Sequence, residues 1–136
     1  MTGERVRRDP PSDWDVEEGD RPGAERPEVF LIRHRDSIRF LRFEEIDWVS
    51  AEGNYSSIHC GRTHYLVRRG IGDLADRLEQ ARFLRINRSA VVNLDRVECL
   101  VPWFNGGYQV RLVTGIDLRL TNGYASRLFQ RVGRPL

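Results

Sequence analysis

Short runs of alternating apolar and polar residues dominate the chain from residue 29 onward. They are rich in β-branched and aromatic side chains and are separated by turn signals such as Gly53-Asn54 and Gly61-Arg62, which is typical of β-strands. Ten runs fit this description: 29–35, 38–43, 46–50, 55–60, 64–69, 83–86, 90–94, 97–103, 108–113 and 116–120. The pattern therefore predicts a β-dominated domain.

Two segments have helical spacing instead. Over 71–81 the apolar residues recur at i, i+3, i+4, i+7 and i+10, with Asp73 in the first turn and Arg82 near the end, where their charges suit the helix dipole. A final helix is predicted over 122–132, with Thr121 as its N-cap. Asn105-Gly106, the strongest two-residue hairpin signal, is predicted to join 97–103 to 108–113.

The composition of residues 1–28 differs from that of the rest of the chain. This segment contains five arginines against nine carboxylates and four of the six prolines, and its only large apolar side chains are Val6, Trp14 and Val16. Such a segment cannot bury enough surface to offset the entropy of ordering it, so we expect a disordered acidic leader or linker. Residues 29–136 form the predicted domain, with 17 arginines against 11 carboxylates and no lysine.

Several classes of protein are disfavoured by what the sequence lacks. No apolar stretch approaches the roughly 20 residues of a membrane span, and no secretory signal is visible at the start. Two cysteines, Cys60 and Cys99, are too few for a disulfide framework or a four-cysteine zinc site. We therefore expect a cytoplasmic protein without a cofactor.

An enzyme is not expected either. His59, Cys60 and His64 lie close together in sequence, and His34 could join them. On a strand, however, His59 and Cys60 point to opposite faces, so both cannot bind one metal ion without a bend. No catalytic motif marks an orienting group or an oxyanion site. We predict neither catalytic nor metal-binding residues.

Three polar groups interrupt the apolar pattern and are the candidate functional sites. Each has an ordinary structural interpretation, as a turn or the start of a helix, and a functional one, as a contact to base edges or phosphates. The residues alone leave both interpretations open. The groups are Asn54, Tyr55 and Ser56; Asn87, Arg88 and Ser89; and Asn122, Gly123 and Tyr124 with Arg127 one turn further on.

Together, these stretches resemble one known family. The strings IDWVSAEGNY at 46–55, FLRINRSAVVN at 83–93 and TNGY at 121–124 are similar, in order and spacing, to the motifs of the LytTR domain. That domain is the DNA-binding output module of many bacterial response regulators. The resemblance covers about 29–132, and its middle motif is the most specific.

The resemblance implies an elongated stack of antiparallel β-sheets with a short helix, whose loops enter successive major grooves and often bend the duplex. Carried over by position, the three polar groups become the DNA-facing residues. Arg85 and Asn93 fit the motif as residues that hold the loop in shape, while Arg68 and Arg69 are phosphate contacts on charge alone. Two copies side by side on repeated half-sites are also implied.

The chain departs from the family pattern at four positions. Asn87 replaces a usual His, Ala90 replaces a common aromatic, and Thr121-Asn122 replaces Ser-Arg. Because Asn122 lacks a charge, guanine reading by the third loop is in doubt, and Arg127 is the residue that would compensate. The changes indicate an altered sequence preference, since phosphate contacts supply much of the affinity.

The sequence therefore predicts a sequence-specific regulator of transcription that binds double-stranded DNA. The alternative is a protein-interaction module of the same fold, acting as an antagonist or partner of a related regulator. The family often places a receiver or a membrane segment before this domain, and neither is visible in the sequence. The chain is thus expected to act alone or with a separate sensor protein, and its acidic leader to fold back on the basic face.

Overall fold

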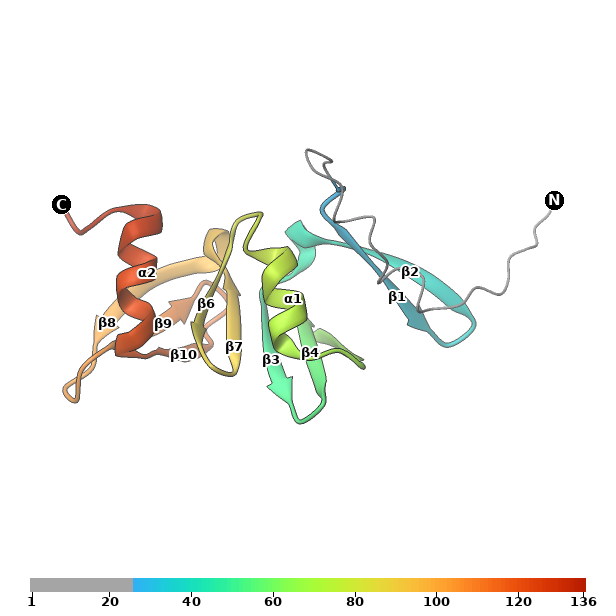
Figure 1. Cartoon of the computed structure of the whole chain (residues 1–136), viewed down its shortest axis with the longest axis horizontal. Coiled ribbons are helices and arrows are strands. Elements are labelled where there is room, and N and C mark those ends of the chain that lie inside the picture. The colour runs from blue at the N-terminus through green and yellow to red at the C-terminus, as the bar shows by residue number, and fades with distance from the viewer. Residues whose placement is uncertain (1–25) are drawn as a thin grey trace.

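Three antiparallel sheets follow one another along the long axis of the molecule (Figure 1). The computed structural model describes residues 26–136; the predicted leader therefore lies outside the described residues, apart from its last three. The elements are β1 (Val29–His34), β2 (Ser37–Arg42), β3 (Trp48–Glu52), β4 (Tyr55–Cys60), β5 (Thr63–Val67), α1 (Ile71–Leu78), β6 (Phe83–Asn87), β7 (Ala90–Asn93), β8 (Val97–Pro102), β9 (Tyr108–Leu112), β10 (Asp117–Leu120) and α2 (Asn122–Val132).

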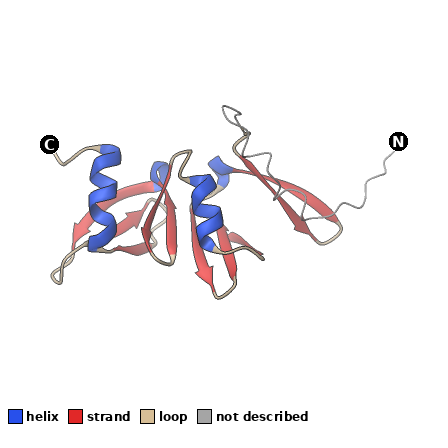
Figure 2. Cartoon of the chain, viewed as in Figure 1, coloured by secondary structure: helices blue, strands red, loops and turns tan. Residues whose placement is uncertain are grey.

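The strands are arranged as a two-stranded, a five-stranded and a three-stranded sheet. Their orders are β1-β2, β5-β4-β3-β7-β6 and β10-β9-β8, and each neighbouring pair is antiparallel. Figure 2 shows that strands predominate and that helices α1 and α2 lie beside the sheets. The predicted fold class, an elongated stack of antiparallel sheets with one or two short helices, is confirmed, and every predicted strand is present to within two residues at either end.

The predicted end of the first helix is wrong in detail. Helix α1 ends at Leu78, because a tight turn follows in which the amide of Ala81 donates to the carbonyl of Leu78. Arg82 therefore lies beyond the helix and pairs with Asp95 at 2.8 Å. Helix α2 has the predicted bounds and Thr121 is its N-cap as predicted; the Thr121 side chain makes no capping hydrogen bond.

The connection between β8 and β9 is longer than the predicted two-residue turn. Pro102 pairs with Tyr108, so five residues form the loop, and both Gly106 and Gly107 have positive φ. A Cβ on Gly107 would lie 2.5 Å from the carbonyl oxygen of Leu120, a distance that no side chain tolerates. The close approach of β10 therefore determines the shape of this turn.

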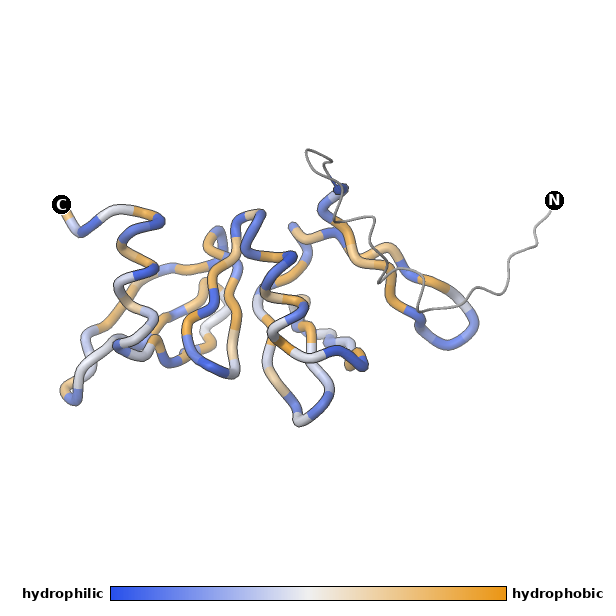
Figure 3. Tube along the Cα trace, viewed as in Figure 1, coloured by the Kyte–Doolittle hydropathy of each residue, from blue (hydrophilic) through white to orange (hydrophobic). Residues whose placement is uncertain are grey.

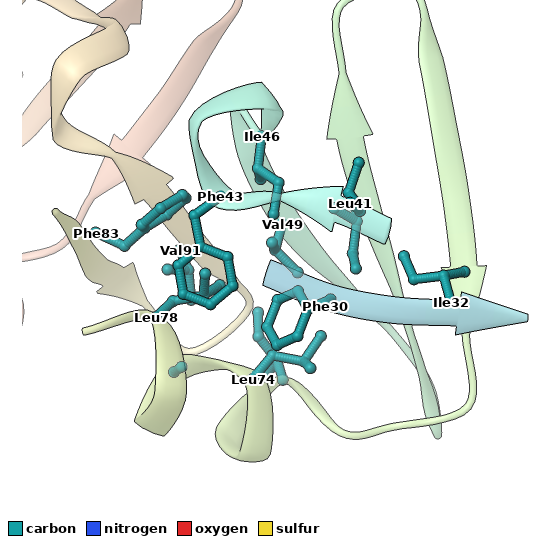
Figure 4. Close-up of a cluster of buried hydrophobic side chains, with 13 residues drawn as sticks. Phe30, Ile32, Leu41, Phe43, Ile46, Val49, Leu74, Leu78, Phe83 and Val91 are labelled. Carbon is teal, nitrogen blue, oxygen red and sulfur yellow. The ribbon is translucent and has the colours of Figure 1, made fainter. Parts of the chain in front are cut away.

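The β6–β7 hairpin is buried on both faces and separates two hydrophobic cores. On one face, Phe83 and Val91 pack with α1 and the β1–β2 hairpin (Figure 4). On the other face, Leu84 and Val92 pack with β9, β10 and α2. Hydrophobic residues lie along much of the strands, and many of the turns are hydrophilic (Figure 3). A strand buried on both faces is apolar at successive positions rather than alternating ones.

A buried carboxylate holds the far ends of the central strands. Asp47 accepts hydrogen bonds from the side chain of Arg96 at 2.9 Å and from the amide of Gly61 at 2.8 Å. Beside it, the buried side chain of Asn93 donates to the carbonyl of Ile46 at 2.8 Å. A buried charge is tolerated only when it is paired and hydrogen-bonded, as here.

The two cores are expected to unfold together because they share the β6–β7 hairpin. Leu78 in the first core and Leu112 in the second are both fully buried. Leu78→Ala and Leu112→Ala should each lower the free energy of unfolding by about 2–5 kcal/mol. In urea, tryptophan fluorescence and far-ultraviolet circular dichroism should report one coincident transition for each variant. Two separate transitions in either variant would show that the cores unfold independently.

Candidate nucleic-acid interface

Strand direction brings the three predicted polar groups to one long edge of the molecule. The β3–β4 and β6–β7 turns lie at the same end of the five-stranded sheet, because β3 and β7 are antiparallel neighbours. The amide of Thr121 donates to the carbonyl of Ile86, which brings the start of α2 to that end as well (Figure 1). We call residues 53–55, 87–89 and 122–124 the turn edge.

The first group presents two of its three residues to solvent. Asn54 lies exposed in the β3–β4 turn, and the Tyr55 ring lies 5.8 Å from the guanidinium carbon of Arg68. Ser56 was predicted to face DNA, but it is 0% exposed and its hydroxyl donates to the carbonyl of Arg69 at 2.7 Å. Because side chains alternate along β4, Ser56 points into the protein. It secures the segment that follows β5.

The second group divides into structural residues and one exposed cation. Asn87 donates to the carbonyl of Arg119 and accepts from the amide of Ser89, both at 2.7 Å, so its amide group shapes the turn instead of being presented to a base. Arg85 donates to the carbonyl of Arg88 at 2.7 Å and holds the turn as predicted. The Arg88 side chain is exposed and pairs with no residue in the described part of the chain.

The third group lies in the first turn of α2. Asn122 and Gly123 are exposed there, and Tyr124 is half-buried against the second core. The guanidinium of exposed Arg127 lies 5.3 Å from the Tyr124 ring centroid. The helix has eleven residues, so its free amides and dipole favour an anion at this end.

Opposite charges pair away from the turn edge. Each ion pair found within residues 26–136 involves a carboxylate from the other end of the strands, and such pairing lowers the pKa of Asp95 and Asp117. These pairs are Arg82–Asp95, Arg96–Asp47 and Arg111–Asp117. By contrast, Arg68, Arg88 and Arg127 have no carboxylate partner in that part of the chain. Their uncompensated charges make the turn edge attractive to a polyanion.

The loop between β8 and β9 extends this edge, and sequence reasoning missed it. Phe104 in this loop is 88% exposed. A Cβ on Gly106 would lie 2.8 Å from the side-chain nitrogen of Asn122, which places the loop directly against the start of α2. Asn105-Gly106 predicted a turn here, but no residue in or near the turn indicated that it would lie against the start of α2.

The histidine and cysteine group forms a packed surface and no metal site. His59 stacks on Trp48 with ring centroids 4.1 Å apart, its Nε2 lies 3.0 Å from the Ser50 hydroxyl, and the His64 ring centroid lies 5.8 Å away. Cys60 packs on the opposite face against the first core, and burial raises the pKa of its thiol to about 12. A thiol with this pKa is a poor nucleophile at neutral pH. Over residues 26–136, no cluster of three or more His, Cys, Asp or Glu side chains is arranged to hold a metal ion.

Comparison with known families identifies the domain that carries the turn edge. The family model described as "LytTr DNA-binding domain" matches residues 36–133, which include the whole turn edge. The chain belongs to this family. A solved LytTr DNA-binding domain, from a putative methyl-accepting/DNA response regulator of Bacillus cereus, has the same fold: the TM-score is 0.70 at 16% identity, covering 79% of this chain and 98% of that one.

Several bacterial proteins are related to this LytTr domain over part of their length. The sensory transduction protein LytR of Staphylococcus haemolyticus is 22% identical over 123 residues, which is 90% of this chain and 48% of that protein. The transcriptional regulatory protein YpdB of Escherichia coli is 27% identical over 94 residues, 63% of this chain and 38% of that protein. The chain thus spans less than half the length of these relatives. No helix in the described part of the LytTr domain is long and apolar enough to cross a membrane.

Asn87 is expected to support the fold of this LytTr domain. Asn87→Ala removes both hydrogen bonds at the end of β6 and leaves the carbonyl of Arg119 unpaired, so the free energy of unfolding should fall by about 1–3 kcal/mol. Ser89→Ala is the control, because only the backbone of Ser89 is bonded and its loss should lie within about 0.5 kcal/mol. Equal stability of the two variants in urea denaturation would contradict this role.

His59 is expected to make the stability of the domain depend on pH. Burial, followed by the nearby His64, lowers the pKa of His59 below its ordinary 6.5. As the pH falls through 6.5, the unfolded chain takes up a proton that the folded state resists, so stability is lost. His59→Gln should therefore flatten the fall in the unfolding free energy between about pH 7.5 and 5. His34→Gln, at an exposed position, should keep the wild-type slope; equal slopes in all three proteins would refute the assignment to His59.

Proposed function

We propose that this LytTr domain is the sequence-specific, double-stranded-DNA-binding part of a transcriptional regulator, and that the turn edge is its DNA contact surface. The observation that carries the proposal is the gathering of three polar groups, distant in sequence, along one edge where Arg68, Arg88 and Arg127 have no carboxylate partner among residues 26–136. Membership of a DNA-binding family supports it. Each turn enters one of the successive major grooves on one side of a duplex.

Arg88 is the residue proposed to read sequence. Its backbone is held by Arg85, and the turn that carries it closes a hairpin with two buried faces. A guanidinium offered from so fixed a position can donate two parallel hydrogen bonds to a guanine edge. Asn54 and Asn122 have exposed amides that reach bases or phosphates, and Arg68 and Arg127 contact phosphates.

Free amides at the start of α2 provide a second kind of contact. Gly123 has no atom within 4 Å of the place where a Cβ would lie, so a phosphate can approach the backbone closely. The helix dipole favours that anion. Asn122 stands where the family pattern has an arginine. In place of that cation, the backbone amides at the start of α2 form the anion site, and Arg127 lies one turn further along the helix.

The wider role of the protein is a proposal that rests on the family. We infer that it acts in the bacterial cytoplasm, where its DNA is found, and that two copies bind adjacent repeats. A separate sensor or regulator protein supplies its signal. These inferences draw on the resemblance to the family. They do not draw on the relatives as whole proteins, because the chain spans less than half of the length of those relatives.

Selection of bound sequences from random duplex DNA tests the proposal directly. The full chain is used, and the enriched duplex is then titrated against a shuffled duplex over a range of salt concentrations. A clear preference for the enriched duplex is the expected result. Equal binding of both with a steep salt dependence would indicate phosphate attraction alone. No binding would instead favour the alternative of a protein-interaction module.

Replacement of Arg88 should cost both affinity and specificity. Arg88→Ala should weaken binding to the selected duplex by about 1–3 kcal/mol and relax the preference at one base pair. Arg62→Ala is the matched control, since Arg62 is an exposed turn arginine at the opposite end of the five-stranded sheet. Electrophoretic mobility shifts on a panel of single-base variants measure both effects. Indistinguishable behaviour of the two variants would remove Arg88 from the interface.

A further inference from the structure

We propose that Phe104 is an apolar DNA contact that packs on bases at the end of the turn edge. The inference deepens the proposed function and rests on it. Phe104 is 88% exposed, which is unusual for a phenylalanine inside a folded loop. Neither the family motifs nor the three polar groups include it.

The loop that carries Phe104 is tightly built. The amide of Trp103 donates to the carbonyl of Gly107 at 3.1 Å, and the amide of Gly106 donates to the carbonyl of Trp103 at 2.9 Å. The side chain of Arg119 donates to the carbonyl of Gly106 at 3.1 Å and lies 4.8 Å from the Trp103 ring centroid. The exposed ring is therefore held out by a fixed backbone.

Trp103 supports the exposed ring from behind. The two aromatic rings are stacked with their centroids 5.6 Å apart, and Trp103 is only half-exposed. One face of the Phe104 ring thus packs against Trp103, while the rest of the ring is exposed to solvent. A ring pre-oriented in this way loses little conformational entropy when it meets a ligand.

The position of the loop identifies what the ring would meet. The loop abuts Asn122 at the start of α2, and Figure 1 shows that it projects at one end of the molecule, on the same side as the β3–β4 and β6–β7 turns. A duplex that lies along the turn edge and contacts Asn122 therefore reaches Phe104 as well. The nearby guanidinium of Arg119 makes the surroundings favourable for a polyanion.

The chemistry of the ring limits the contact to bases. A phenylalanine donates and accepts no hydrogen bonds and gains nothing from phosphate. On duplex DNA, its apolar partners are the C5-methyl group of thymine in the major groove and the faces of bases at a partly opened step. Both contacts are apolar packing on bases, and the experiment separates them.

The test compares Phe104→Ala with Phe40→Ala in the full chain, on the duplex obtained by selection. Phe40 is a good control, because it is 58% exposed on β2, in a different sheet from β8 and β9. Phe104→Ala should weaken binding on the order of tenfold with an unchanged salt slope, since no phosphate contact is lost. Phe40→Ala should bind as the wild type does. Both variants should keep the wild-type midpoint of unfolding in urea.

Two altered duplexes distinguish the two base contacts. If the ring packs on a methyl group, deoxyuridine in place of thymidine near the end of the site weakens the wild type to the level of Phe104→Ala and leaves that variant unaffected. If the ring enters an opened step, 2-aminopurine at that step brightens when the wild type binds but not when Phe104→Ala binds. Either result supports the proposal.

The inference about Phe104 can be wrong while the proposed function is right. Wild-type affinity in Phe104→Ala, together with lost selectivity in Arg88→Ala, would overturn the contact at Phe104 and leave the DNA-binding edge in place. A large decrease in the salt slope of Phe104→Ala would also overturn it, because the loop would then act through phosphates. If the wild type itself shows no preference among duplexes, the proposed function is wrong and this inference is wrong with it.

Discussion

Burial of the β6–β7 hairpin on both faces is the constraint on which the rest of the structure depends. Alternate residues of the two strands supply one side of each hydrophobic core, so these strands have no solvent-facing side on which to place polar groups. Apart from half-buried Arg85 in the middle of β6, their polar side chains lie at the two ends. At one end the buried amide of Asn93 satisfies backbone groups, and at the other Asn87 does the same. The side chain of Arg88, in the turn at this second end, is exposed.

The same antiparallel packing separates charge along the molecule. Asp47 and its partner Arg96 join strand ends at one side of the five-stranded sheet, where a carboxylate is needed to bind the amide of Gly61. At the opposite side, Arg68, Arg88 and Arg127 pair with no carboxylate in the part of the chain that the structure describes. The paired acids thus stabilise the fold at one side, while the turn edge combines these arginines with exposed Glu52 at the end of β3. A small net charge of +2 conceals this polarity.

The sequence predicted the strands, both helices and the presence of the three polar groups, because periodicity and turn residues are local signals. It did not predict which residues of each group are structural. Ser56 and Asn87 have the same chemistry as exposed neighbours, and their roles depend on carbonyls of Arg69 and Arg119 that are distant in sequence. The five-residue loop was missed for a similar reason: the close approach of the Leu120 backbone to Gly107 is a contact distant in sequence, which local signals do not reveal.

Because the two cores share the β6–β7 hairpin, the three parts of the turn edge lie at fixed distances from one another. The β3–β4 turn, the β6–β7 turn and the start of α2 are joined through strands that belong to both cores, so their separations cannot be adjusted one at a time. One additional base pair in B-form DNA advances the next contact by 3.4 Å and rotates it by about 35° around the axis. A ligand touching all three points must therefore match the protein in phase as well as in composition. Where the spacing is imperfect, the duplex has to deform, and flexible steps between the contacts become part of what is recognised.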